Sequence, residues 1–320
     1  MTSDFVMDRI PIAVSSCLLG QEVRYDGGHK HNAYITRTLG EYFEYTAFCP
    51  EVAIGLGIPR PSIQLVKVGD EIRVRGSKDP QLDVTDSLRA YAQSIIPALD
   101  GFCGYIFKKS SPSCGMERVK VYHPNGNPVT SGRGAYADVI MQALPELPVE
   151  EEGRLMDPVL RENFIERVFV YHRWQQFKHT GITAAGLVQF HTEHKFTLLA
   201  HDETVYRELG RLIADAGKAN LEQLALDYIR RLMQALCKPA TRKTHTNVLM
   251  HIMGYVKEGM TSEDKQELLD ILEKYRLGQV PLIVPITLLK HYLRRYPDEY
   301  IQQQVYLNPH PEELMLRNSL

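Results

Sequence analysis

Three cysteines that lie far apart in the chain each follow a short apolar stretch and stand among turn-forming residues. They are Cys17 in C-L-L-G, Cys49 in C-P-E and Cys114 in S-P-S-C-G. Thiolate sulfur suits zinc and iron–sulfur centres, which usually take four protein ligands, so a set of three would leave one coordination position open. The clustered C-x-x-C signature is absent. The alternative, that these are small side chains buried at strand ends, therefore stays open.

The residues before each cysteine predict the strands that would carry them. Residues 10–19, 45–50 and 101–109 are short apolar runs, and such runs without alternation are typical of buried strands. Parallel strands end at one edge of their sheet, where ligands bind. We therefore expect the three cysteines to meet at that edge.

The intervening segments indicate the architecture of this first part. Helical spacing or a capping signal occurs at 32–44, 83–101 and 134–144. Residues 62–76 predict a hairpin, and 119–134 a short excursion. Strands that alternate with helices predict an α/β domain with a Rossmann-like, mainly parallel sheet and flanking helices.

The second part of the chain is predicted to be an all-α domain. A segment with three prolines, a glycine and an acidic run, residues 143–158, suits a linker. We therefore place an α/β domain at 1–148 and a helical domain at 149–320. Periodicity and capping signals, including Thr261 before an acidic turn, predict helices at 158–179, 183–200, 202–216, 220–237, 242–258, 262–276 and 284–296.

Carboxylate and hydroxyl groups accompany the cysteines. Glu51 lies two residues after Cys49 and could act as a general acid or base, although a solvated loop carboxylate is the alternative. Ser111 and Ser113 flank Pro112 and could bind a substrate or simply stabilise the loop.

Charged side chains near the three cysteines would make the sheet edge cationic and suited to a polar or anionic ligand. Ordinary surface ion pairs are the alternative for each of them. The candidates for substrate contact are Arg24, Asp26, Arg60 and Lys108.

Other metal-binding side chains have plainer interpretations. Cys103 falls within a predicted strand and is expected to be a buried core thiol. Cys237 stands near a helix end and is expected to be structural. His191 and His194 are three residues apart on a predicted helix, a spacing more often found on a polar face than in a metal site.

Together these motifs carry a resemblance. The series S-S-C-L-L-G…R-Y-D-G, C-P-E…G-L-G-I-P-R and F-K-K-S-S-P-S-C-G resembles the thiouracil desulfidase (TudS-type) family over residues 10–145. The remainder resembles a YbgA-like helical domain, through T-H-T-N-V-L-M-H-I-M-G-Y and V-P-L-I-V-P-I-T-L-L. The two-domain arrangement is similar to enzymes that remove sulfur from 4-thiouridine in RNA.

The resemblance implies a [4Fe–4S] cluster bound by Cys17, Cys49 and Cys114, with Glu51 and Ser111 as acid/base groups. A cluster held by three cysteines leaves one iron free to polarise a thiocarbonyl as a Lewis acid. The net reaction would be hydrolytic, converting a thiolated pyrimidine to its carbonyl form with release of hydrogen sulfide.

The helical domain is the candidate for binding RNA, with tRNA as the expected partner. Basic clusters with aromatic residues can bind RNA backbone and bases, but the aromatics could equally be core. A desulfidase of free thiouracil or its nucleotides, and a non-catalytic metal-binding interaction protein, stay open. The residues concerned are Arg230, Arg231, Lys238–Lys243, Arg294 and Arg295, with Tyr171, Trp174, Phe177, Phe190, Tyr292, Tyr296 and Tyr300.

Composition and charge narrow the class of protein. Lys and Arg total 37 against 39 Asp and Glu, a formal net charge of −2 that excludes a histone-like nucleic-acid binder. No apolar stretch is long enough to span a membrane. The acidic N-terminal residues do not form a secretory signal, so a cytoplasmic protein without a membrane partner is expected. The oligomeric state is not indicated.

Overall fold

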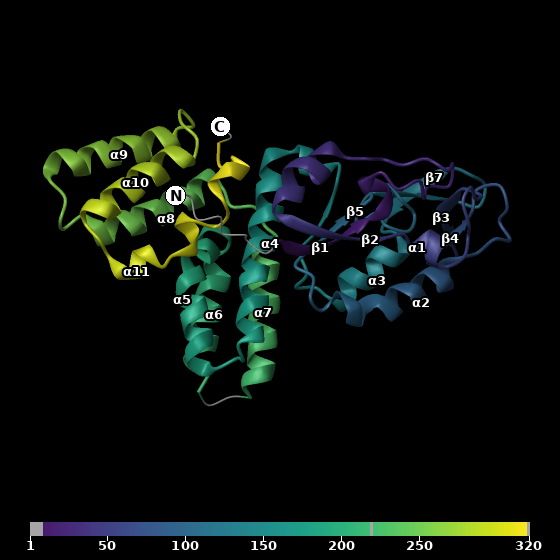
Figure 1. Cartoon of the computed structure of the whole chain (residues 1–320), viewed down its shortest axis with the longest axis horizontal. Helices are drawn as coiled ribbons and strands as arrows, with labels where there is room; N and C mark the ends of the chain where they lie inside the picture. Colours follow the sequence, from purple (N-terminus) through teal and green to yellow (C-terminus); the bar gives the residue numbers. More distant parts are fainter. Residues whose placement is uncertain (1–8, 218–219, 319–320) are drawn as a thin grey trace, which may run out of the picture. The chain divides into compact units, whose positions relative to one another are not determined.

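The structure, a computed structural model, describes residues 9–217 and 220–318. The chain divides into two compact units between Met156 and Asp157 (Figure 1). This division falls within the predicted linker of 143–158, later than the boundary placed at 148. The prediction about a secretory signal concerns the first residues, which lie outside the described part.

The first unit contains the predicted parallel sheet. Its strands are β1 (Ile10–Ser15), β2 (Phe43–Phe48), β5 (Tyr105–Phe107) and β8 (Val149–Glu151), in the order β2-β1-β5-β8. All neighbouring pairs run parallel. The pairing of β8 with β5 explains why the first unit extends past residue 148.

A second four-stranded sheet lies in the same unit. It contains β3 (Ile63–Val68), β4 (Glu71–Gly76), β6 (Val119–Tyr122) and β7 (Pro128–Gly132), in the order β4-β3-β6-β7. The hairpin predicted at 62–76 is confirmed, since β3 and β4 pair antiparallel. The segment interpreted as an excursion is instead a pair of strands, and β6 pairs parallel with β3.

Three α-helices belong to the described part of the first unit: α1 (Pro50–Ala53), α2 (Thr85–Ile95) and α3 (Ala135–Ala143). The predicted helix at 32–44 is wrong in its second half. Short helical turns end at Glu41, and Phe43 already begins β2 because it pairs with Ile10 of β1.

The second unit is helical, as predicted. Most of its helix ends fall within one or two residues of the predicted ends, and Thr261 caps α9 by accepting a hydrogen bond from the Asp264 amide at 3.1 Å. The helices are α4 (Pro158–His179), α5 (Ala184–His201), α6 (Glu203–Ala214), α7 (Leu221–Leu236), α8 (Arg242–Val256), α9 (Ser262–Arg276), α10 (Ile283–Arg295) and α11 (Glu299–Gln302).

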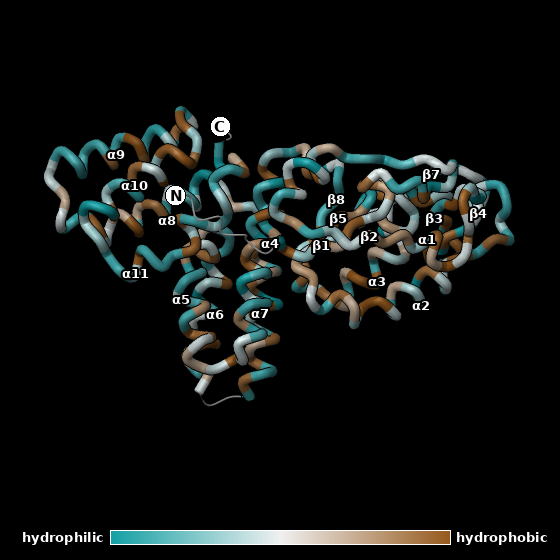
Figure 2. Tube along the Cα trace, viewed as in Figure 1, coloured by the Kyte–Doolittle hydropathy of each residue, from teal (hydrophilic) through white to brown (hydrophobic). Residues whose placement is uncertain are grey.

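Aromatic side chains build much of the core of the second unit. Trp174 of α4 packs edge-on against Phe190 of α5, and both are buried. Tyr171 and Tyr292 are also buried. Figure 2 shows hydrophobic residues recurring between hydrophilic ones along α8, α9 and α10, the pattern of helices that bury one face. These four aromatic rings are therefore core residues, and the prediction that they could stack on RNA bases is wrong.

None of the helices in residues 9–217 and 220–318 is both long enough and apolar enough to cross a membrane.

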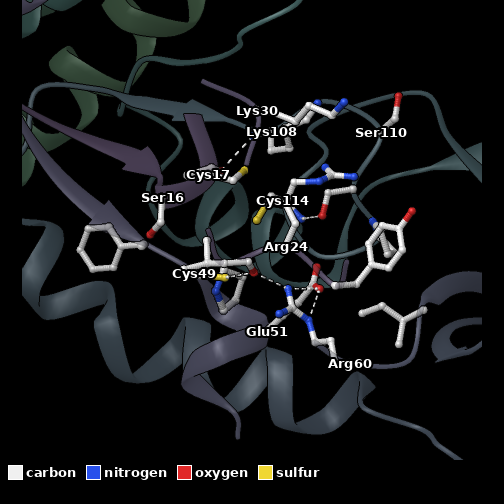
Figure 3. A pocket seen from close by; sticks show the side chains of 18 of the residues that line it. Ser16, Cys17, Arg24, Lys30, Cys49, Glu51, Arg60, Lys108, Ser110 and Cys114 are labelled. Atoms are coloured by element: carbon white, nitrogen blue, oxygen red, sulfur yellow. Dashed lines mark hydrogen bonds and ion pairs between the residues drawn. The ribbon is translucent and has the colours of Figure 1, made fainter. Parts of the chain in front are cut away.

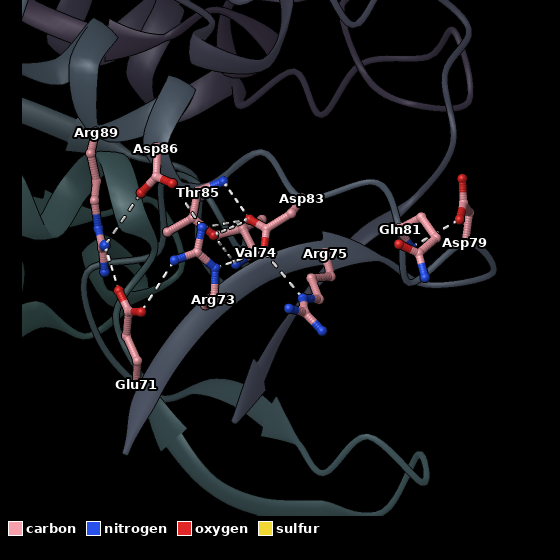
Figure 4. A network of polar contacts seen from close by, with 10 residues as sticks. All are labelled: Glu71, Arg73, Val74, Arg75, Asp79, Gln81, Asp83, Thr85, Asp86 and Arg89. Atoms are coloured by element: carbon pink, nitrogen blue, oxygen red, sulfur yellow. Dashed lines mark hydrogen bonds and ion pairs between the residues drawn. The ribbon is translucent and has the colours of Figure 1, made fainter. Parts of the chain in front are cut away.

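A polar network joins β4 to the start of α2 (Figure 4). The Asp83 carboxylate accepts hydrogen bonds from Arg73 at 2.6 Å, from Arg75 at 3.1 Å and from the Thr85 hydroxyl at 2.7 Å. The Thr85 hydroxyl in turn accepts a hydrogen bond from the backbone amide of Val74. Asp83 thus fixes the strand and the helix to each other.

Replacing Asp83 by asparagine is expected to lower the free energy of unfolding by about 1–2 kcal/mol at neutral pH. Burial alone would raise the pKa of this carboxyl, but the bonds from Arg73, Thr85 and Arg75 hold it well below 3.8. The stabilisation is therefore present above about pH 4 and lost as pH falls through the folded-state pKa. Urea unfolding of the wild type and of Asp83→Asn at pH 7 and pH 3 measures this difference. If the free energy of unfolding changed equally with pH in the two proteins, the prediction would be contradicted.

Candidate active site

The carboxyl ends of β1, β2 and β5 open onto one cavity of about 460 Å³. Cys17, Cys49 and Cys114 all line it. In Figure 3 their sulfur atoms lie around one common space, although they come from three separate loops. The predicted meeting of the three cysteines at one sheet edge is confirmed.

Local backbone structure presents each thiol. Cys17 lies in a single helical turn that follows β1 and ends at Gly20, whose φ of 92° suits glycine. Cys49 is the N-cap residue of α1, directly after β2. Cys114 ends a loop after β5, where its amide donates to the Ser111 hydroxyl at 3.1 Å.

Burial makes these thiols poor acids when nothing cationic is bound. It raises the pKa of Cys17 to about 11 and also raises the pKa of Cys49 and Cys114. A metal centre supplies the positive charge that thiolates need, and binding it releases the thiol protons. The donor set therefore fits a cationic iron–sulfur centre.

Glu51 stands at the cavity wall in a fixed orientation. Its Oε2 accepts hydrogen bonds from Arg60 Nε at 2.9 Å and Nη2 at 2.8 Å, and its Oε1 accepts one from the Ser113 hydroxyl at 3.0 Å. Arg60 also donates to the carbonyl oxygens of Gly57 and Val23. Both guanidinium donors bind the same carboxylate oxygen, and these charge-assisted hydrogen bonds fix its position.

Arg60 and Ser113, which the sequence suggested as substrate contacts, have other partners. The Arg60 side chain is 3% exposed and its donors are taken by Glu51 and two carbonyls. Ser113 is fully buried and is not among the residues that line the cavity. Both residues therefore position Glu51. Arg60 also lines the cavity, so its predicted contact with a substrate stays a prediction.

Ser111 lies on the cavity wall, as predicted. Its hydroxyl oxygen accepts hydrogen bonds from the amides of Ser113 at 3.2 Å and Cys114 at 3.1 Å. This residue therefore shapes the loop that carries Cys114, and its hydroxyl proton is still available to a ligand.

Of the remaining charged candidates, two line the cavity and one lies outside its lining. Arg24 and Lys108 line the cavity. Lys108 also forms an ion pair with Glu152, which follows β8. Asp26 is not among the lining residues, and its carboxylate accepts a hydrogen bond from the Gly28 amide and lies 3.4 Å from Arg24. Its contribution is therefore to the turn that orients Arg24.

Sequence reasoning did not single out Lys30 and Tyr25, which also line the cavity. Figure 3 shows Lys30 beside Lys108 above Cys17. The Lys30 amide donates to the Cys17 carbonyl at 2.8 Å, which brings the chain back over the cysteine. The signal was available in G-G-H-K-H, a basic segment soon after the first cysteine.

The other cysteines and the histidine pair lie outside this cavity. Cys103 is buried as expected, although it precedes β5 instead of lying within it. Cys237 follows α7, and its Sγ lies 3.4 Å from the Met233 carbonyl oxygen. His194 stacks on Phe190 at 4.0 Å between ring centres, and His191 contacts the Tyr228 hydroxyl. Both histidines therefore pack against aromatic side chains of the helical unit.

Gly134 allows the Cys114 loop to pack against the start of α3. A Cβ at this position would clash with the Ser113 carbonyl and lie 2.8 Å from the Cys114 nitrogen. Gly134→Ala is therefore expected to cost about 1–3 kcal/mol of stability and to displace Cys114. Thermal unfolding and iron content after reconstitution measure this. Gly101→Ala, which has open space around the added methyl, is the matched control. Equal behaviour of the two variants would contradict the prediction.

Two family models match parts of this chain. Residues 12–152 match the family model of 2-thiouracil desulfurase, and residues 195–311 match a family of unknown function, DUF1722. The first unit therefore contains the match to 2-thiouracil desulfurase, and the second unit contains the match to DUF1722.

Two curated proteins are similar to parts of this chain. The uncharacterized protein YbgA of Escherichia coli (strain K12) is 36% identical over 154 residues, which are 48% of this chain and 91% of that protein. The chain belongs to the YbgA family. The uncharacterized protein YbbK of Bacillus subtilis (strain 168) is 29% identical over 138 residues, 41% of this chain and 90% of that protein.

A solved structure of the [4Fe-4S]-dependent thiouracil desulfidase TudS is 32% identical in sequence. The match covers 47% of the present chain and 95% of the TudS chain, with a TM-score of 0.36.

Proposed function

We propose that this chain is a [4Fe–4S]-dependent desulfidase that converts 4-thiouridine in tRNA to uridine and releases hydrogen sulfide. The observation that carries the proposal is the arrangement of Cys17, Cys49 and Cys114 around one cavity, beside a carboxylate held by Arg60. The match of this unit to the 2-thiouracil desulfurase family supports the reaction class.

The three cysteines are the residues that would hold the cluster, because they line one cavity and cysteine thiolates are the usual ligands of an iron–sulfur cluster. Within the described ranges, no three Cys, His, Asp or Glu side chains form a site for a single metal ion.

The residues of the chain suggest how hydrolysis would proceed. When bound, the cluster supplies an iron that polarises a thiocarbonyl group as a Lewis acid. Glu51 is placed to take a proton from the attacking water and to return it to the departing sulfur, so that C=S and H₂O become C=O and H₂S. Arg24, Lys30 and Lys108 would hold the polar edge of the pyrimidine or a nearby phosphate.

The choice of RNA over a free base is supported by the second unit. Exposed basic side chains on its surface include Arg231, Lys238, Lys243 and Arg294. Such cations bind the phosphate backbone in a salt-dependent manner. A 4-thiouridine inside folded tRNA must also be accessible or be extruded to reach the cavity.

One anaerobic experiment tests the proposal. The protein is reconstituted with iron and sulfide and mixed either with tRNA that contains 4-thiouridine or with free thiouracil. Loss of thiocarbonyl absorbance and release of sulfide are followed. Turnover of the tRNA is the expected result, and Lys238→Gln with Lys243→Gln should weaken tRNA binding and reduce its salt dependence.

The alternative substrates give distinct results. Turnover of free thiouracil alone would overturn the RNA assignment and leave a desulfidase of small thiolated pyrimidines. A cluster-loaded protein that is inert on both substrates would overturn the desulfidase assignment and favour a non-catalytic metal protein.

A further inference from the structure

A second cavity, of about 210 Å³, lies within the helical unit. Its walls come from α4, the end of α5, the start of α8 and the C-terminal segment. No residue of the candidate active site lines it. Its ionisable side chains are Glu162, Glu166, His201, Arg242, His245 and Arg317.

His201 and Glu166 form a buried pair on the wall of the cavity. His201 Nδ1 lies 2.6 Å from the Lys238 carbonyl oxygen, and its Nε2 lies 3.1 Å from the Glu166 carboxylate. Because a carbonyl oxygen can only accept, Nδ1 donates to it. Burial alone would raise the pKa of Glu166, but its contacts with His201 and Arg317 lower it to about 2.

Arg317 is the first cation of the cavity and is incompletely paired. It is 4% exposed and lies 3.5 Å from Glu162 and 3.4 Å from Glu166. Its Nη1 donates to the Tyr306 carbonyl oxygen at 2.7 Å, whereas its buried Nε has only the ion pair with Glu162 and no hydrogen-bond partner. A buried guanidinium nitrogen without a partner is costly and points to a missing acceptor.

Arg242 is a second cation, and no carboxylate within residues 9–217 and 220–318 pairs with it. Its Nη1 donates to the carbonyl oxygens of Tyr275 at 2.9 Å and Val280 at 3.3 Å. Its Nε and Nη2 make no hydrogen bond within those ranges. Together these two nitrogens form the edge of a guanidinium that binds an oxyanion in a bidentate manner.

The start of α8 adds to this positive potential. Arg242 is the first residue of this 15-residue helix, and Ala240 just before it lines the cavity. Helix N-termini favour anions through their free amides and their dipole. The two arginines balance the two carboxylates of the cavity, Glu162 and Glu166, and Arg242 is the cation that no carboxylate in the described ranges pairs with.

We propose that this cavity binds inorganic phosphate, held by Arg242 and Arg317 at the N-terminus of α8. Its volume is below the range of about 300–1,000 Å³ that is typical of drug-sized ligands, which favours a small ion. This site is separate from the proposed desulfidase activity and does not depend on it.

Glu162 distinguishes phosphate from other oxyanions. A carboxylate on the wall repels a fully ionised anion such as sulfate. It can instead accept a hydrogen bond from the protonated oxygen that inorganic phosphate keeps at neutral pH. The site should therefore prefer phosphate to sulfate.

The test is isothermal titration calorimetry of the full chain with inorganic phosphate, sulfate and uridine 5′-monophosphate. Phosphate is expected to bind at least about tenfold more tightly than sulfate, and Arg242→Gln is expected to weaken phosphate binding about tenfold or more. Arg276→Gln removes the same charge from an exposed position on α9 and should leave the affinity within about twofold.

A second variant keeps the proposal falsifiable if Arg242→Gln does not fold. Glu162→Gln should reduce the preference for phosphate over sulfate, because an amide can also donate to sulfate. No phosphate-dependent heat at millimolar concentration, or unchanged affinity in folded Arg242→Gln, would overturn the proposal. Tighter binding of the nucleotide than of inorganic phosphate would overturn the assignment to the free ion.

Discussion

Sulfide release from tRNA that contains 4-thiouridine, catalysed by the anaerobically loaded protein, is expected to fall more than about 100-fold when Cys17, Cys49 or Cys114 is replaced by alanine. Loss of residues that merely support a metal ligand typically costs 10–100-fold, so loss of a ligand itself should cost more. All three thiols line one cavity and come from different strand ends. No neighbouring cysteine within the described residues can replace a lost one there.

Iron content and visible absorbance per chain, measured together with the initial rate, check this prediction. Cys103→Ala and Cys237→Ala are the matched controls, because both thiols lie outside the cavity lining. They should keep iron and activity, although Cys103→Ala can lower stability since Cys103 is buried. A Cys17, Cys49 or Cys114 variant with full iron content and an unchanged rate would contradict the three-cysteine assignment.

The cysteine site could be predicted from the sequence because its logic is topological. Three apolar runs followed by turn residues predict parallel strands, and parallel strands deliver their loops to one edge. The helices of the second unit could be predicted for a similar reason, since long periodic segments with caps such as Thr261 leave few alternatives.

Short and polar strands escaped prediction. β8 has three residues, Val149–Glu151, with acidic side chains inside a segment typical of a linker. Only its pairing with β5 identifies it as a strand. β7 is mostly exposed and carries little hydrophobic signal, so its partnership with β6 in a second sheet depends on contacts that no local pattern encodes.

Side-chain partners were predicted less well than side-chain locations. The sequence placed Arg60 and Lys108 near the cavity but could not show that each has a carboxylate partner. Arg60 pairs with Glu51, and Lys108 pairs with Glu152, which is 44 residues away in the chain. Such pairs depend on how loops fold back, which is why the role of Arg60 in holding Glu51 could not be predicted from the sequence.

Because Arg60 holds Glu51 in place, replacing Glu51 is expected to have the second large effect on the reaction rate. Glu51→Gln is expected to lower kcat for desulfurisation by about 10²- to 10⁴-fold, the usual contribution of a positioned acid or base. The amide has nearly the same shape but cannot take up a proton. Arg60 and Ser113 use three of roughly four acceptor positions on the carboxylate, which leaves one on Oε1 for a water molecule.

Three measurements separate proton transfer from a structural role for Glu51. Iron content should stay at the wild-type level in Glu51→Gln, and KM should change little, so the loss appears in kcat. Arg60→Lys keeps the charge but loses the paired donors to Oε2, and it should give an intermediate fall in kcat because Glu51 is then free to turn. If Glu51→Gln keeps kcat within about threefold with full iron content, Glu51 is not the proton-transfer group. The Ser111 hydroxyl, with its unused proton at the cavity wall, then becomes the group to test.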